Sequence, residues 1–200
     1  MTRLSASDAV ALPGLAVMAV GLFCFAIALL AARLRAGKEA RGNPTRSRRS
    51  MVGIFIQGIA ILISAYGPIL TTLDPLSTTA LVEAATCAAL MATAVALFVW
   101  ASRTMGRNWS IVARTRADHS LADTGPFAYL RHPIYTALFL LMIAFAIAYG
   151  HSARLILTIP LYALGTWLRI GEEERLLHSV FGTAYDAYAA RVTRFVPRLF

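Results

Sequence analysis

Residues 133–169 read PIYTALFLLMIAFAIAYGHSARLILTIPLYALGTWLR, two apolar runs separated by a short polar link. The first run, 133–150, is just long enough to cross a bilayer, which takes about 20 helical residues. The second run, 155–168, has fourteen residues between Arg154 and Arg169, or about 21 Å of helix at 1.5 Å per residue. The pattern predicts a transmembrane helical hairpin that holds Arg169 within the depth of the membrane.

Three further apolar runs precede this hairpin. Residues 9–32, 51–73 and 84–102 carry no charged side chain. Over the whole chain 58% of the residues are hydrophobic and 14% are charged, against about 25% charged in soluble domains. We therefore expect an all-α integral membrane protein with five transmembrane helices, the last two forming the hairpin. Cys24 and Cys87 lie inside apolar runs, so we expect neither a disulfide framework nor a metal site.

The net charge of +9 is unevenly placed along the chain. Seventeen of the 19 Lys and Arg residues lie in segments 33–50, 103–132 and 169–200, all on one side of the five-helix arrangement. Basic residues gather on the cytoplasmic side of membrane proteins. This predicts an external N-terminus, a cytoplasmic C-terminus and, from the composition, a bacterial inner membrane. No nucleic-acid-binding motif accompanies the charge, so we expect no nucleic-acid partner.

The chain is therefore expected to have two parts. Residues 1–102 would form three transmembrane helices with a basic cytoplasmic loop at 33–50. Residues 103–200 would form the functional part, consisting of a cytoplasmic connector, the hairpin at 133–170 and C-terminal helices. The external links are short, so any site is expected on the cytoplasmic face.

The first candidate site stretch is GPFAYLRHPIY at 125–135. Pro133 suits the first position of a helix, and it disfavours a helical conformation at His132. Arg131 and His132 would thus lie at the positive end of a helix, where backbone donors and an arginine suit a carboxylate or another anion. Tyr135 follows one turn later. The same residues also fit a basic boundary at the membrane surface with Tyr135 at the interface.

The second stretch is RIGEEERLL at 169–177. If the helix continues, Arg169 and Glu173 share one face, and Glu173 points to the apolar side while Glu172 and Glu174 lie on more polar faces. Arg followed by Glu is the weaker order for stabilising an isolated helix, and a charge at membrane depth usually marks a site. The alternative is an ordinary interfacial Arg169. Further on, Tyr185 and Tyr188 either line a pocket or pack the C-terminal segment onto the membrane surface.

Taken together and in order, these stretches resemble the isoprenylcysteine carboxyl methyltransferase family, part of a wider group that includes membrane phospholipid methyltransferases. Residues 105–110, MGRNWS, are also similar to that family, and the resemblance covers about residues 105–197. The motifs that carry it are Gly125-Pro126-Phe127, Arg131-His132-Pro133-Ile134-Tyr135, Glu173-Glu174 and Phe181-Gly182 with Tyr185 and Tyr188.

The resemblance implies an S-adenosylmethionine-dependent methyltransferase whose cofactor pocket is formed by the connector and the C-terminal helices. Arg169 and Glu173 are the implied catalytic residues, with Arg169 facing the substrate. The implied cofactor-binding residues are Gly125, Pro126, Leu130, Arg131, His132, Pro133, Tyr135 and Glu173. The methyl acceptor would be the carboxylate of a lipophilic, isoprenylcysteine-like substrate among membrane lipids. Alternatives are a phospholipid or another small lipophilic amine or thiol and, from another class, a non-catalytic membrane scaffold.

Overall fold

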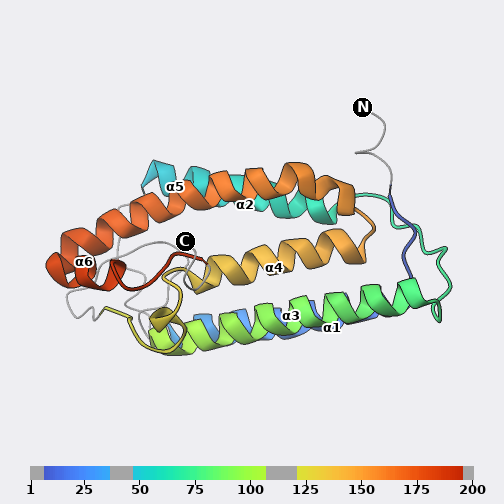
Figure 1. Cartoon of the computed structure of the whole chain (residues 1–200), viewed down its shortest axis with the longest axis horizontal. Helices are drawn as coiled ribbons and strands as arrows, with labels where there is room; N and C mark the ends of the chain where they lie inside the picture. Colours follow the sequence, from blue (N-terminus) through green and yellow to red (C-terminus); the bar gives the residue numbers. More distant parts are fainter. Residues whose placement is uncertain (1–6, 37–46, 107–120, 196–200) are drawn as a thin grey trace.

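The computed structural model describes residues 7–36, 47–106 and 121–195. Five long helices run side by side along the length of the molecule (Figure 1). Within the described ranges the regular structure is helical, with two isolated β-bridges and no strand. The predicted all-α class is confirmed. The elements are α1 (Leu12–Arg35), α2 (Arg48–Ala65), α3 (Thr78–Met105), η3 (Gly125–Ala128), α4 (Pro133–Ala148), η4 (Ser152–Arg154), α5 (Leu155–Phe181) and α6 (Thr183–Ala189).

Three helices, α1, α2 and α3, are long and apolar enough to cross a membrane. Their outer faces expose large apolar side chains, among them Phe23, Phe55 and Val82 at 60% exposure or more. A water-soluble monomer rarely leaves such continuous apolar surface uncovered. Helix α4 is shorter at 16 residues, so crossings by α4 and α5 stay predictions.

The long helices form two pairs with α4 between them (Figure 1). Helices α1 and α3 pack together and against α4 through an apolar core that includes Met18, Phe25, Met91, Phe98 and Leu141. Every residue of α4 from Ile134 to Ala148 except Tyr135 and Thr136 is Ala, Leu, Ile, Met or Phe. A helix that is apolar on all sides is expected where other elements or lipid surround it.

The second pair, α2 and α5, meets through small and polar residues. The buried residues of α2 recur every three or four positions and are Ser50, Gly53, Gln57, Ala60 and Ser64. A Cβ atom on Gly53 would lie 2.7 Å from the carbonyl oxygen of Gly165, and one on Gly165 would lie 2.9 Å from that of Gly53. The two glycines therefore allow a close backbone approach of the kind that small residues provide between membrane helices.

Several helix boundaries differ from the predicted runs for local reasons. Helix α2 ends at Ala65 rather than at residue 73, because Gly67 takes a positive φ of 148° and Pro68 lacks the N–H that a helix requires. Helix α3 begins at Thr78, where the Ser77 side chain accepts a hydrogen bond from Ala80 N. Helix α5 continues past Arg169 to Phe181 and ends at Gly182, which also has positive φ.

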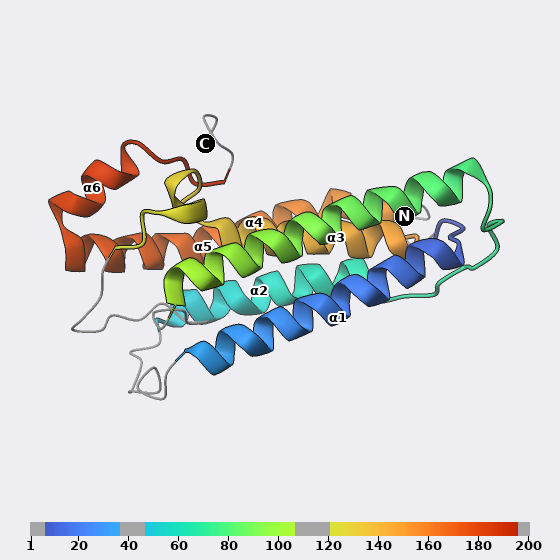
Figure 2. The same cartoon turned by 90° about the horizontal axis from the view of Figure 1, so that it is seen from below.

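One end of the bundle gathers elements that are distant in sequence. Figure 2 shows η3, α6 and the last described residues near the start of α4. Helix α5 extends past the start of α4 at this same end. Residues 121–135 and 169–195 therefore share one end of the molecule. This is the end that carries both candidate site stretches.

Replacing Gly53 with alanine should destabilise the α2–α5 pair by about 1–3 kcal/mol, because the new Cβ would lie 2.7 Å from the Gly165 carbonyl oxygen, which is fixed backbone, as well as 2.6 Å from Arg169 Cγ. Gly58, on the same helix, is the matched control, since a Cβ there meets nothing within 4 Å. Gly58→Ala should leave stability unchanged or raise it through helix propensity. Thermal unfolding of the detergent-solubilised variants measures both, and equal midpoints would contradict the close approach.

Candidate active site

The Arg131-His132-Pro133 stretch leads directly into α4. Pro133 is the first helical residue and His132 is the non-helical residue before it, with φ −129° and ψ 55°, as predicted. The N–H groups of Arg131 and His132 donate to the carbonyl oxygens of Thr193 and Arg194, at 2.8 and 3.2 Å. The C-terminal segment thus pairs with this stretch along its backbone, and the parallel bridge between Leu130 and Thr193 continues the pairing.

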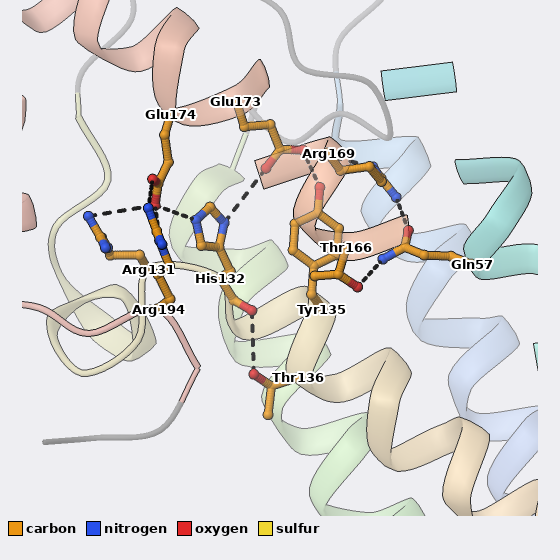
Figure 3. A network of polar contacts seen from close by, with 10 residues as sticks. All are labelled: Gln57, Arg131, His132, Tyr135, Thr136, Thr166, Arg169, Glu173, Glu174 and Arg194. Carbon is orange, nitrogen blue, oxygen red and sulfur yellow. Dashed lines mark hydrogen bonds and ion pairs between the residues drawn. The ribbon is translucent and has the colours of Figure 1, made fainter. Parts of the chain in front are cut away.

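Arg169, Glu173, Tyr135 and His132 form one contiguous group (Figure 3). The Tyr135 hydroxyl donates to Glu173 Oε1, and the Arg169 guanidinium lies over the Tyr135 ring, 4.7 Å from its centre. Arg169 Nη2 is 3.8 Å from Glu173 Oε1, and His132 Nδ1 is 3.7 Å from Glu173 Oε2. All four side chains come from the two predicted motifs. Tyr135 lies on α4, Arg169 and Glu173 lie on α5, and His132 directly precedes α4. The continuous helix and the i,i+4 placement of Arg169 and Glu173 are confirmed.

Glu174 is the most strongly paired carboxylate of this end. Its two oxygens accept hydrogen bonds from Arg194 at 2.7 and 3.1 Å, and Oε1 lies 3.1 Å from His132 Nε2 and 3.6 Å from Arg131 Nη1. Burial alone would raise the pKa of Glu174, but the hydrogen bonds from His132 and Arg194 and the positive charge of Arg131 lower it to about 2. This carboxylate is therefore charged at neutral pH and fastens the C-terminal segment to α5.

The expectation that Glu172 and Glu174 lie on more polar faces than Glu173 is wrong. Their side chains are 8% and 14% exposed, against 22% for Glu173. Glu174 is covered by Arg194 and His132, and Glu172 pairs with Arg175 at 2.7 Å. Helical periodicity alone cannot show that a distant C-terminal segment covers one face of α5.

The two tyrosines of α6 separate into different environments. Both rings are buried with Val192 in a small apolar cluster. The Tyr188 hydroxyl donates to the carbonyl oxygen of Phe127 at 2.8 Å, so Tyr188 packs α6 against η3. Burial, followed by the negative charge of Glu174, raises the pKa of Tyr185 to about 12, so its hydroxyl is a protonated donor at neutral pH.

Two buried donors lie beside Glu174, Nε of Arg131 and the hydroxyl of Tyr185. Neither makes a hydrogen bond of good geometry within the described residues, although the Arg131 side chain lies close enough to the Tyr185 hydroxyl to lower its pKa. Buried polar atoms normally have a partner, so these donors fit an acceptor group of a ligand, such as a carboxylate. The residues present therefore suit the carboxylate-bearing cofactor that the resemblance implies. No group of three His, Cys, Asp or Glu side chains suited to a metal occurs in the described ranges.

The remaining predicted residues lie at the same end of the bundle or outside the described residues. Gly125 and Pro126 begin η3, and Gly125 has φ 59° and no room for a Cβ, which would lie 2.5 Å from Thr104 Oγ1. Phe127, in the same short helix, and Leu130 are both buried. The part of the MGRNWS motif at 107–110 lies outside the described residues.

The isoprenylcysteine carboxyl methyltransferase (ICMT) family matches residues 76–179. The chain belongs to this family. The resemblance stated from the motifs is thus confirmed, and the matched segment includes all the residues proposed for the ICMT site from α4 and α5. Gln57 on α2 and Arg194 in the C-terminal segment lie outside it.

Two relatives are protein-S-isoprenylcysteine O-methyltransferases. The one from Schizosaccharomyces pombe is 30% identical over 91 residues, 44% of this chain and 37% of the relative. The one from Tribolium castaneum is 33% identical over 100 residues, 47% of this chain and 34% of the relative. The chain thus spans about a third of the length of these curated relatives.

Sequence reasoning missed Glu174, Arg194 and Gln57 as members of this network. Three consecutive glutamates before a basic C-terminal segment were a signal for the Glu174–Arg194 pair. Gln57 is the single amide side chain in the uncharged run 51–73. An isolated amide in an apolar run was the sequence feature that could have indicated a buried polar contact. The partner of each lies far away along the chain.

Glu174→Gln should lower the free energy of unfolding by about 3 kcal/mol at pH 7, the equivalent of the depressed pKa of this carboxyl. Because the folded-state pKa is below the unfolded-state value, the contribution is complete above about pH 5 and disappears as the pH falls toward 2. Thermal unfolding of both proteins from pH 7 to pH 2 should show the two midpoints converging.

Asp186→Asn serves as the control for that series, since Asp186 pairs with His178 at an exposed position, 57% and 60% exposed. Such surface pairs contribute about 0–1 kcal/mol. A midpoint difference for Glu174→Gln that is constant across the pH range would contradict the pairing.

Proposed function

We propose that this protein is an integral-membrane, S-adenosylmethionine-dependent methyltransferase that methylates the carboxylate of a lipophilic, isoprenylcysteine-like acceptor. The observation that carries the proposal is the Arg169–Glu173–Tyr135–His132 group, buried at one end of an apolar helical bundle in a chain of the ICMT family. The names of its relatives support the same chemistry.

The cofactor-side residues would be those of the Arg131–Tyr135 motif with Glu173. Arg131 Nε and the Tyr185 hydroxyl supply buried donors suited to a carboxylate, and the Glu173 carboxylate suits a positively charged group. Gly125, Pro126 and Leu130 would shape the pocket wall. When bound, S-adenosylmethionine supplies a methyl group already activated on a positively charged sulfur.

For a carboxylate acceptor, the site has to orient the acceptor and does not have to remove a proton from it. The carboxylate is ionised at neutral pH, so no general base is required. Arg169 would hold it through a guanidinium, whose planar donors match a carboxylate. Positioning of two reactants can account for about 7–11 kcal/mol of a reaction barrier. Exclusion of water by the C-terminal segment, fastened through Glu174 and Arg194, would complete the role of this chain's residues.

The position of the site supports a substrate that is itself in the membrane. Arg169 lies one helical turn before Glu173 on α5, whose apolar first part exposes Ile156, Leu157 and Leu164. A lipid-tailed acceptor would reach Arg169 sideways between helices. In a five-helix arrangement, the placement of the basic residues supports a site on the cytoplasmic face and an external N-terminus.

The alternatives make different chemical demands. An amine acceptor such as a phospholipid head group would need a base, for which Glu173 or His132 would serve. A thiol acceptor would need a group that stabilises the thiolate. A non-catalytic scaffold would have no need of the Glu173 carboxylate.

Binding of S-adenosylmethionine to the detergent-purified protein is the first test. Wild type should bind, and Glu173→Ala and His132→Ala should each weaken binding at least about tenfold, the equivalent of a lost hydrogen bond to a charged group. His178→Ala is the matched control, since His178 is exposed and contacts Asp186. Absence of binding by folded wild type would contradict the proposed function and favour a scaffold.

The acceptor atom is tested with labelled cofactor and N-acetyl-S-farnesylcysteine. A methyl ester is lost in mild base, whereas an N-methyl or S-methyl product is retained. We expect base-labile product from wild type and at least about a hundredfold less from Arg169→Ala, because the anion loses its charged partner. Base-stable label in membrane lipids instead would support the phospholipid alternative.

A further inference from the structure

A buried set of polar side chains, Gln57 and Thr166, joins α2 to Arg169 of the candidate site; we call it the polar seam. Gln57 is 3% exposed and Thr166 is also 3% exposed, and both lie between α2 and α5 close to Arg169 (Figure 3). Gln57 precedes the segment that matches the ICMT family. Nothing in the family's motifs therefore accounts for a buried amide at this place.

The hydrogen bonds determine which way the Gln57 amide points. Thr166 Oγ1 donates its proton to the carbonyl oxygen of Tyr162 at 2.8 Å, so toward Gln57 it acts as an acceptor. The amide nitrogen of Gln57 donates to Thr166 Oγ1 at 2.7 Å. The amide oxygen then faces Arg169 Nη1, which has only protons to offer, at 2.9 Å. If the amide were flipped, its NH2 group would face the N–H donors of Arg169, and the two sets of donors would oppose each other.

The same seam restricts Arg169 from other directions. Its aliphatic stem lies over Gly53, where a Cβ would be 2.6 Å from Arg169 Cγ. Its guanidinium lies over the Tyr135 ring at 4.7 Å. The hydroxyl of Tyr162 donates to the Tyr135 carbonyl oxygen at 2.8 Å, which ties α5 to α4 at this level. The amide of Gln57 thus acts on a side chain that is already confined.

The choice of an amide has a chemical consequence. A carboxylate at position 57 would pair with Arg169 and cancel its charge, whereas the neutral oxygen of Gln57 orients the guanidinium and leaves its charge intact. Glu173 Oε1 is 3.8 Å from Arg169 Nη2, longer than a hydrogen bond. A neutral partner at position 57 thus orients the Arg169 guanidinium without placing a second carboxylate beside it in addition to Glu173.

We infer that Gln57 is a positioning residue that holds Arg169, through a neutral hydrogen bond, in the orientation that receives the carboxylate of the methyl acceptor. This inference rests on the proposed function. It assigns to α2, outside the family-matched segment, a role in acceptor recognition and none in cofactor binding. Thr166 acts one step further away by fixing the amide.

The test compares Gln57→Glu, Gln57→Leu and Thr166→Val in membranes or detergent. N-Acetyl-S-farnesylcysteine is the acceptor and S-adenosylmethionine the methyl donor. We expect Gln57→Glu and Gln57→Leu to raise the acceptor KM at least about tenfold, with Gln57→Glu the more severe because the new anion also repels the acceptor. The Kd of S-adenosylmethionine should stay within about twofold of wild type, a split that general loss of packing would not produce.

Ser64→Ala is the matched control, because Ser64 donates to Thr158 at 3.1 Å in the same α2–α5 interface without contacting Arg169. It should leave the acceptor KM unchanged. Thr166→Val, the mildest change, keeps both Gln57 and Arg169 and should raise the acceptor KM in the same direction if the larger variants fail to fold. An unchanged acceptor KM in the variants that fold, or an equal rise in Ser64→Ala, would overturn the inference while leaving the proposed function intact. Absence of methylation by wild type would overturn both.

Discussion

A guanidinium and three successive carboxylates on one helix cannot be buried without partners, and this end of the molecule is arranged around that constraint. Removing one partner of a buried ion pair costs several kcal/mol. Here the partners come from four places: α2, the start of α4, α5 itself and the C-terminal segment. The charged residues of α5 thereby specify which distant segments must converge.

The adjacent carboxylates Glu173 and Glu174 illustrate two ways of meeting the constraint. Glu174 accepts two hydrogen bonds from Arg194 and lies close to His132 and Arg131, so its charge is fully compensated. Glu173 accepts from the neutral Tyr135 hydroxyl, while its cationic neighbours stay 3.7 and 3.8 Å away. The first arrangement suits a structural anchor. The second suits a carboxylate that keeps negative potential for a ligand, which is why Glu173 and not Glu174 carries the functional proposal.

How much of this arrangement could be predicted from the sequence depended on the distance between the interacting residues. The start of α4 at Pro133 and the i,i+4 placement of Arg169 and Glu173 are local consequences of proline geometry and helical spacing, and both were predicted. The pairing of Glu174 with Arg194 crosses 20 residues and a change of direction at Gly182. The contact between Gln57 and Arg169 crosses 112 residues, and in the sequence Gln57 is one polar letter in an apolar run. Periodicity assigns a face to such a residue but not the element opposite it.

The site therefore draws on more of the chain than the segment that matches the ICMT family. Residues 76–179 contain Arg131, His132, Tyr135, Arg169 and Glu173, but the backbone donors of Arg131 and His132 are satisfied by residues 193–194, and Arg169 is held from α2. Helices α1 and α3 pack against α4 through apolar side chains. The α2–α5 interface, in contrast, is narrow because of Gly53 and Gly165 and polar because of Gln57 and Thr166. A close backbone approach is what brings a short amide within reach of an arginine on the opposing helix. If the seam were packed with larger apolar residues, α2 would still be a suitable membrane helix, but it would have no means of acting on the site.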